Sequence, residues 1–320
     1  MITIKCGKLF CEKYNEVNNT SLTPKEIFCD IIAPLLFNSN RHLVNWTNSK
    51  FFNMLKLYNR GKFELNDENF AEVVKSFCEL VETDYGVMTS ANVYYGCAIP
   101  TLKGEGQTTM FSYSDNVYFD IDERYCSFIG SIFSIQCNGL NFIIDNKELV
   151  WEIYEGILMY RYFIDNNTNI ADKQLYAWNS IYLKTKYDNK DVLTKIEEYI
   201  VKDRLDINNK INFSNFLFLI SKLNKNIKHI QLYSCKNGNF TYPTILLNLD
   251  YVKRMSEIFQ KLYVEMDEDF EYFNFDKTFG QKNILYKAIQ NGAVYEGMFN
   301  PIEDIDPKNK YQIKYIEFIM

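Results

Sequence analysis

The sequence predicts an α+β fold in which helices dominate and the β-sheets are small and antiparallel. Apolar residues recur with helical spacing over residues 66–82 and 146–161, which is typical of amphipathic helices. Asn-Gly dipeptides at residues 138–139 and 237–238 lie between apolar runs, as they do in tight β-hairpins. No apolar run reaches the length of a membrane span, so we expect no membrane partner.

Length and composition indicate a folded chain with a sizeable core. The 320 residues are 47% hydrophobic and 16% aromatic, which excludes general disorder. No linker or internal repeat divides the chain. We place a division near residue 165, between a mixed α/β part with a central Gly-rich loop (1–165) and a mainly helical part with a hairpin (166–320). A single domain is the alternative.

The eight cysteines favour a protein with reduced thiols. None is arranged as C-x-x-C, and the spacings fit neither a zinc ribbon nor a redox pair. Most lie inside apolar runs, where a thiol behaves as a small hydrophobic group. Since the first residues also lack the pattern of a signal peptide, we expect a cytoplasmic protein whose cysteines are buried and reduced.

The first 52 residues predict a strand, a short helix and a loop. Residues 2–11 are interpreted as a strand or extended arm. Thr23 to Glu26 form a capping box with proline at the first helical position, and the helix should end near Ala33 because Pro34 disfavours helical geometry before it. The Asn-rich stretch 38–52 is interpreted as a loop, in which His42 is a surface or loop-pinning residue rather than a catalyst.

Residues 66–82 predict an amphipathic helix capped by Asn66 or Asp67. Its apolar stripe is expected in the core and its opposite face is acidic. The stripe consists of Phe70, Val73, Val74, Phe77, Leu80 and Val81, and the acidic face of Glu68, Glu72, Glu79 and Glu82.

The stretch 94–146 is the centre of the sequence and carries a Gly-rich loop at residues 103–109. Glycines let backbone amides approach a ligand closely. Both the G-K-[ST] of a P-loop and G-x-G-x-x-G are missing, which favours a surface loop. If the loop binds a ligand, we expect Lys103, Gln107 and Thr108 to make the contacts.

Residues 117–122 alternate like a β-strand, which raises the question of a metal site. On a strand, Asp120 and Asp122 would project from one face, as two carboxylates that hold a divalent cation must. A strand with one solvent-exposed face and one buried face explains the same alternation. No third ligand is recognisable, so we expect no metal or other cofactor, with Asp120 and Asp122 as weak candidates.

The rest of the chain alternates predicted helices with one hairpin. Asn146 caps the strong helix that follows the first Asn-Gly turn, and its expected core face includes Leu158. Pro243 places the second hairpin at a sheet edge. Further helices are predicted over residues 174–187, 192–204, 212–223 and 250–264, hairpin strands over 229–235 and 240–247, and a closing strand over 314–320.

Charge is unevenly distributed around the net value of -6. Acids far outnumber bases over residues 61–160, whereas the stretch 222–261 carries seven bases against Asp250 and Glu257 only. With interleaved aromatic residues, such a surface suits phosphate contacts and base stacking. Two alternatives to nucleic-acid binding explain the same bases. Lysines near helix C-termini stabilise the helix dipole, and charged residues also form ordinary solvated faces. The seven are Lys222, Lys225, Lys228, Lys236, Lys253, Arg254 and Lys261.

Several segments resemble the large subunit of type I CRISPR effector (Cascade) complexes. They are IKCGKLFCEKYN, NSNRHLVNWTNSKFF, YYGCAIPTLKGEGQTTM and the helix after FIIDN. The resemblance implies a non-catalytic subunit that recognises the protospacer-adjacent motif and holds target DNA, with Asn45, Lys103 and Gln107 reading the duplex. The chain is short for that family, and it lacks the C-x-x-C of members that carry a zinc ribbon.

Three functions follow as hypotheses. The first is a non-catalytic subunit that binds DNA or RNA in an antiviral complex, with other subunits as partners. The second is a protein-interaction or structural module of a defence or mobile-element system. The third is a metal-dependent nuclease that uses Asp120, Asp122 and Glu123. No catalytic signature of high specificity supports an enzyme, and no nucleophile elbow accompanies either histidine.

Overall fold

The chain divides into two compact units, which we describe separately. The first is Met1–Lys210 with Tyr233–Thr241, and the second is Ile211–Leu232 with Tyr242–Met320. The helix-rich α+β class is confirmed, whereas the division near residue 165 stays a prediction. The computed structural model describes residues 2–37, 41–44, 67–83, 120–137, 140–166, 170–188, 229–236, 239–240, 245–248, 250, 252–253, 257, 261, 307–308, 313 and 317.

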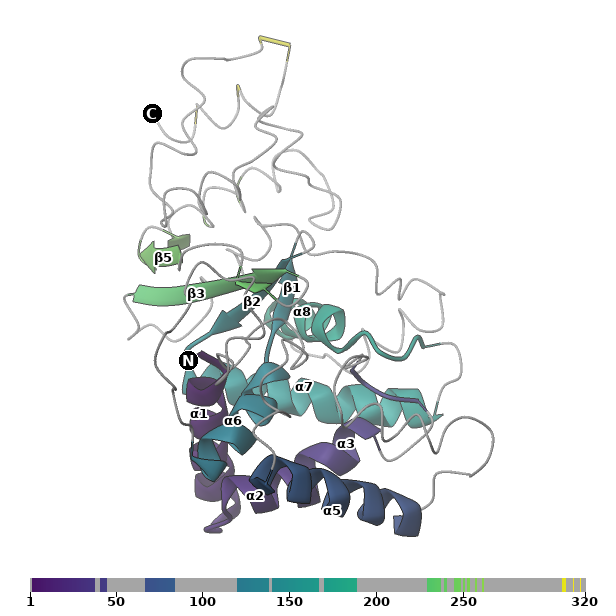
Figure 1. Ribbon diagram of the computed structural model, residues 1–320. Coiled ribbons are helices and arrows are strands. Elements are labelled where there is room, and N and C mark those ends of the chain that lie inside the picture. Colours follow the sequence, from purple (N-terminus) through teal and green to yellow (C-terminus); the bar gives the residue numbers. More distant parts are fainter. Residues whose placement is uncertain are drawn as a thin grey trace. The chain divides into compact units, whose positions relative to one another are not determined.

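The chain begins with a helix, α1 (Ile2–Asn18), so the strand or extended arm predicted over residues 2–11 is wrong. The buried residues include Ile2, Cys6 and Phe10, which are spaced by four and therefore lie on one helical face. The stretch also fits period-two alternation over a few residues, which explains the misassignment. In Figure 1, α1 lies beside α6 (Ile121–Ser131).

The second helical segment continues past Pro34 because the helix becomes a π-helix, which is wider than an α-helix, just before that residue. The capping box at Thr23 begins α2 (Pro24–Glu26), which continues as the π-helix η1 (Ile27–Ile32) and then α3 (Ala33–Phe37). In an α-helix the proline ring would clash with the carbonyl four residues earlier. A π-helical turn relieves this constraint, so the predicted end near Ala33 is wrong.

The contact between α1 and α6 is so close that two glycines are required. A Cβ atom on Gly7 would lie 1.9 Å from the carbonyl oxygen of Cys126, and one on Gly130 would lie 1.8 Å from that of Thr3. The Thr3 and Ser127 hydroxyls lie 3.1 Å apart in the same buried contact. Small residues thus let the two backbones touch, whereas side chains separate most packed helices.

The alternation over residues 117–122 is not a strand where the structure describes it. Asp120 is the N-cap of α6, and its carboxylate accepts a hydrogen bond of 2.7 Å from the backbone amide of Glu123. Asp122 lies in the first turn of the helix and is exposed. Aspartates at these positions favour a helix start because they satisfy free amides and oppose the positive end of the dipole.

The first hairpin and the helix after it are confirmed. Strands β1 (Ile135–Cys137) and β2 (Leu140–Ile144) pair antiparallel with Cys137 opposite Leu140. Asn146 caps α7 (Lys147–Asn166), accepting from the amide of Leu149 at 2.9 Å. The expected core face is buried except Leu158, which is 45% exposed.

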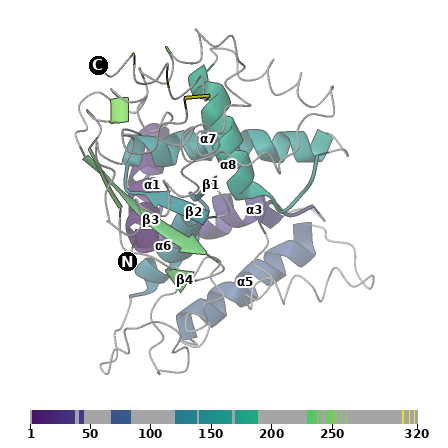
Figure 2. The same cartoon turned by 90° about the horizontal axis from the view of Figure 1, so that it is seen from above.

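The predicted helix over residues 174–187 is confirmed as α8 (Leu175–Asp188), which crosses α7 (Figure 2). Gly156 lies at the crossing, where a Cβ atom would be 2.5 Å from the ring of Tyr182. The ring of Trp178 stacks on Tyr160 at 4.8 Å, and its indole N–H donates to the carbonyl of Gly156 at 2.7 Å. Buried aromatic residues thus fasten the two helices.

The predicted amphipathic helix over residues 66–82 is confirmed as α5 (Asp67–Thr83). The described members of its apolar stripe, Phe70, Val74 and Val81, are buried. No helix in the described part of the chain is long and apolar enough to cross a membrane.

The second hairpin is confirmed in part. Strand β3 (His229–Lys236) pairs with β4 (Asn239–Phe240) and with β5 (Ile245–Asn248), which lie at the two ends of the predicted second strand. Residues 241–244 lie outside the described residues. The described positions of the helix expected over 250–264 are helical, in agreement with the prediction. Glu317 is also helical, which contradicts the closing strand expected over 314–320 at that position. The helices expected over 192–204 and 212–223 lie outside the described residues.

We expect Gly130→Ala to lower the free energy of unfolding by about 3 kcal/mol or more, because a backbone oxygen cannot yield to the new methyl group. An ordinary helical glycine would instead gain stability from alanine. Chemical denaturation of the variant measures the loss. Gly156→Ala is the matched control with a smaller loss, since the ring of Tyr182 can move. Equal stability of Gly130→Ala and the parent chain would contradict the close backbone contact.

Candidate functional site

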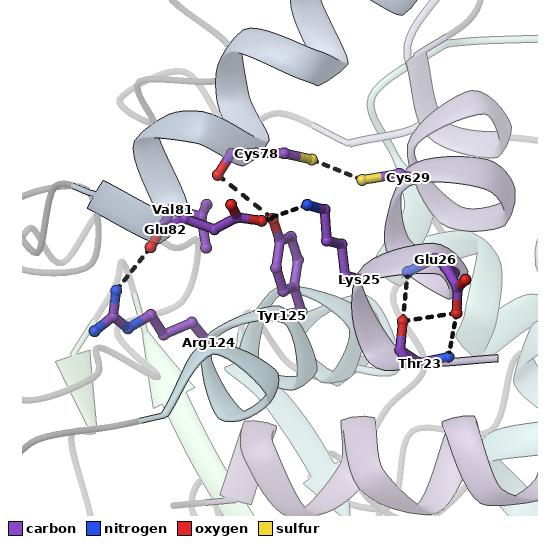
Figure 3. A network of polar contacts seen from close by, with 9 residues as sticks. All are labelled: Thr23, Lys25, Glu26, Cys29, Cys78, Val81, Glu82, Arg124 and Tyr125. Atoms are coloured by element: carbon purple, nitrogen blue, oxygen red, sulfur yellow. Dashed lines mark hydrogen bonds and ion pairs between the residues drawn. The ribbon is translucent and has the colours of Figure 1, made fainter.

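The candidate site lies where the C-terminal half of α5 meets η1 and α6 (Figure 3). It combines two thiols, a phenol, a carboxylate and two cationic side chains from three parts of the sequence. These groups belong to Cys29, Cys78, Tyr125, Glu82, Lys25 and Arg124.

Local sequence signals place the residues contributed by α2 and η1. The amide of Thr23 donates to the Glu26 carboxylate at 2.7 Å, and the amide of Glu26 donates to the Thr23 hydroxyl at 3.3 Å. This confirmed capping box fixes the start of the helix. Lys25 and Cys29 are four residues apart, so both project toward α5 from successive turns.

Helix α5 presents Cys78 and Glu82 with the same four-residue spacing. The Glu82 carboxylate accepts from the ammonium group of Lys25 at 2.5 Å. Both side chains are partly exposed, and such pairs contribute little to stability on their own. The ion pair therefore orients the helices more than it stabilises them.

Helix α6 supplies the buried groups that hold the end of α5. The guanidinium of Arg124 donates to the carbonyl of Val81 at 2.7 Å, and the hydroxyl of Tyr125 lies 3.5 Å from the carbonyl of Cys78. The last carbonyls of a helix have no partner within the helix. Arg124 thus satisfies one of them from a neighbouring helix, and its positive charge opposes the negative end of the α5 dipole.

The two thiols of the site lie in direct contact. The sulfur atoms of Cys29 and Cys78 are 2.6 Å apart, although the residues are 49 positions apart in the sequence. A hydrogen bond from Cys29 lowers the pKa of Cys78 to about 7, with help from Tyr125 and Lys25 and against the effect of burial. The same bond raises the pKa of Cys29. The contact therefore favours a proton on Cys29 and the thiolate form of Cys78, which is about half populated near pH 7.

His42 is buried rather than on the surface, with 2% of its area exposed. Its ring meets Phe37 edge-on at 5.5 Å, and its carbonyl accepts from the amide of Lys173 at 2.7 Å. Burial, followed by the positive charge of Lys173, lowers the pKa of His42 to about 4. The surface interpretation of His42 is therefore wrong, the loop-pinning interpretation stays a prediction, and the ring is neutral at pH 7.

The structure does not place the weak metal candidates, Asp120 and Asp122, on one face of a strand. Asp120 is committed to capping α6, and Glu123 accepts from Lys8 at 2.8 Å. Within the ranges that the structure describes, no group of three histidine, cysteine, aspartate or glutamate residues could hold a metal ion. The nuclease hypothesis thus loses the strand geometry on which it rested.

The residues predicted to bind nucleic acid stay predictions. Lys236 is the last residue of β3, and Lys253 is helical and half-buried. Asn45, Lys103, Gln107, Lys222, Lys225, Lys228 and Arg254 lie outside the described residues, as does Thr108.

Sequence reasoning missed the thiol pair altogether. No local motif joins Cys29 to Cys78, because the contact depends on how α5 packs against η1. The only signals were the four-residue spacings of Lys25 with Cys29 and of Cys78 with Glu82, which place each pair on one helical face. Those spacings do not say which faces meet.

We expect His42 to make stability depend on pH. Since folding lowers its pKa to about 4, its contribution is fully present above the unfolded value of about 6.5 and is lost as the pH falls toward about 4. The loss is at most roughly 3 kcal/mol. Carboxylates titrate in the same window, so the measurement is the difference in unfolding free energy between the parent chain and His42→Gln from pH 7 to pH 4.

His229→Gln is the control for this measurement, because His229 is the other histidine of the sequence. It also removes an imidazole, so a change in the profile that only His42→Gln causes belongs to the buried ring and not to the loss of a histidine as such. A His42→Gln profile that runs parallel to the parent profile over the whole range would show that the folded and unfolded pKa values of His42 are alike.

Comparison of the chain with protein-family models, with curated proteins and with solved structures found no match.

Proposed function

We propose that the chain is a non-catalytic subunit of a multi-protein complex and that residues 222–261 bind the phosphates of a nucleic acid. The observation that carries the proposal is the distribution of basic residues. A protein of net charge -6 binds a polyanion only where its bases are concentrated and available.

The described lysines of the first unit are largely engaged by carboxylates. All three lysines of α1 form ion pairs: Lys5 with Asp145, Lys8 with Glu123 at 2.8 Å, and Lys13 with Glu148 at 3.0 Å. Lys147 pairs with Glu12 and Glu16, and Lys186 pairs with Glu155. Phosphates would have to compete with these carboxylates for the lysines, so this part of the surface is poorly suited to bind nucleic acid.

The stretch 222–261 has the opposite balance. Its seven bases face only Asp250 and Glu257, so internal pairing can neutralise at most two of them. The described residue Lys261 is helical and exposed. Tyr233, Phe240, Tyr242 and Tyr251 lie among the bases in the sequence and could stack on unpaired bases of a single strand.

The finer form of the proposal is a large subunit of a type I CRISPR effector complex that recognises target DNA. This form is supported by the four sequence segments that resemble the large subunit of those complexes. In this form Asn45, Lys103 and Gln107 read the duplex, while the basic stretch holds the backbone. The other subunits of the complex are then its protein partners.

A protein-interaction module is the second candidate, favoured by an apolar pair on α7. Leu158 and Tyr162 are 45% and 60% exposed, and they lie one helical turn apart. Large apolar side chains exposed side by side suit a protein partner better than a nucleic acid. The same subunit could use this face for its assembly.

We expect Lys253→Glu with Arg254→Glu to weaken nucleic-acid binding by at least about tenfold near 0.1 M salt. Each lost phosphate contact should reduce the slope of log affinity against log salt by roughly 0.9. A fluorescence anisotropy titration with labelled single- and double-stranded DNA and RNA, at several salt concentrations, measures both quantities. Lys75→Glu is the matched control for Lys253→Glu, because Lys75 is an exposed lysine of α5 outside the basic stretch.

Purification from the native host, with and without nuclease, tests the assembly. A complex that carries short RNA and loses it on nuclease treatment supports the effector subunit. A protein-only complex, together with charge-reversal variants that bind like the parent chain, would remove the nucleic-acid proposal and favour the interaction module.

A further inference from the structure

We propose that Cys29 and Cys78 are a redox-active pair that hydrogen peroxide oxidises to a disulfide, which joins η1 to α5. This inference goes beyond the proposed function and does not depend on it. It assigns a modification site to two cysteines that the sequence places among buried, reduced thiols.

The geometry of the pair is close to that of a disulfide. The two sulfur atoms lie 2.6 Å apart on separate helical segments, and Figure 3 shows both side chains directed at each other. A disulfide bond is about 2.05 Å long, so the sulfurs must approach by only about half an ångström.

The surroundings of the pair prepare one thiol as a nucleophile. The hydrogen bond with Cys29 favours the thiolate of Cys78, and the Tyr125 hydroxyl and the Lys25 ammonium group act in the same direction. The pKa of Cys78 falls to about 7 as a result, and thiolates rather than thiols attack peroxides. Cys78 is 5% exposed and Cys29 is partly exposed, which suits an oxidant as small as hydrogen peroxide.

The reaction balances in two steps with hydrogen peroxide as the oxidant. The Cys78 thiolate attacks one peroxide oxygen, the O–O bond breaks, and the departing hydroxide takes a proton to become water, which leaves a sulfenic acid on Cys78. The Cys29 sulfur then attacks the Cys78 sulfur, the S–O bond breaks, and the hydroxide leaves as water with the Cys29 proton. In total two thiols and one peroxide give one disulfide and two waters.

The other described thiols are poorer candidates, which makes the site selective. Burial raises the pKa of Cys6, whose thiol donates to the carbonyl of Ile144. A hydrogen bond to Cys126, followed by burial, raises the pKa of Cys11, and these two residues are 7% and 1% exposed. At neutral pH the thiols of Cys6 and Cys11 therefore stay protonated, and Cys126 has almost no surface for an oxidant to reach.

The disulfide would lock a contact that already exists. Arg124, Tyr125 and the Lys25–Glu82 pair hold this end of α5 in place when the thiols are reduced. The cross-link closes a loop between positions 49 residues apart, which restricts the unfolded chain. Oxidation thus forms a reversible cross-link that raises the stability of the fold without changing it.

The test exposes the folded full-length chain to hydrogen peroxide near neutral pH, blocks free thiols with N-ethylmaleimide, and maps peptides without reduction. We expect a peptide pair linked through Cys29 and Cys78 as the first product, which dithiothreitol reverses. The unfolding midpoint should rise by roughly 10 °C on oxidation. Cys29→Ser should show no rise, whereas Cys6→Ser, the matched buried-thiol control, should behave like the parent chain.

Peptide mapping of the parent chain keeps the test decisive even if a serine variant is unstable. Cross-links between other cysteines as the first product would overturn the proposal. So would Cys78 carried on to sulfinic acid while Cys29 stays free, or a pair that stays reduced in folded protein at peroxide doses that oxidise the remaining thiols.

Discussion

The backbone contact between α1 and α6 is the constraint on which the first unit depends. With the carbonyls of Cys126 and Thr3 occupying the space of two side chains, neither helix can rotate or slide without losing the fit. One turn further along α1, Phe10 meets the rings of Phe133 and Tyr154 at 5.0 and 4.9 Å. One glycine-lined contact thus sets the position of α6 and, through aromatic packing, of α7.

A fixed α6 is what allows the thiol site to exist. Arg124 and Tyr125 are nearly or fully buried and lie directly before Cys126, whose carbonyl touches Gly7. Their positions are therefore set by the same contact that holds α1. They in turn hold the end of α5, so the sulfur of Cys78 meets that of Cys29 at 2.6 Å. The packing of α6 against α1 therefore determines where the residues of the thiol site lie.

The sequence predicted the elements whose signals are local, and it failed where tertiary packing decides. The capping box at Thr23, the hairpin before Leu140 and the cap at Asn146 are each specified within a few residues, and all are confirmed. The strand prediction for α1 is wrong because its first residues fit both the strand and the helix period, and packing against α6 decides between the two. The thiol pair was out of reach for a similar reason, since cysteine spacing identifies only sites built from neighbouring residues.

Electrostatics connects the described part of the first unit with the proposed function. Its lysines hold helices together by meeting carboxylates of other elements, as Lys13 meets Glu148 across 135 positions of sequence. Bases used in this way are largely neutralised, and a phosphate must displace a carboxylate to reach them. Within the stretch 222–261, by contrast, only Asp250 and Glu257 are available to meet seven bases. A chain of net negative charge can therefore still attract a polyanion, because the local surplus of available bases, and not the total charge, decides where phosphates bind.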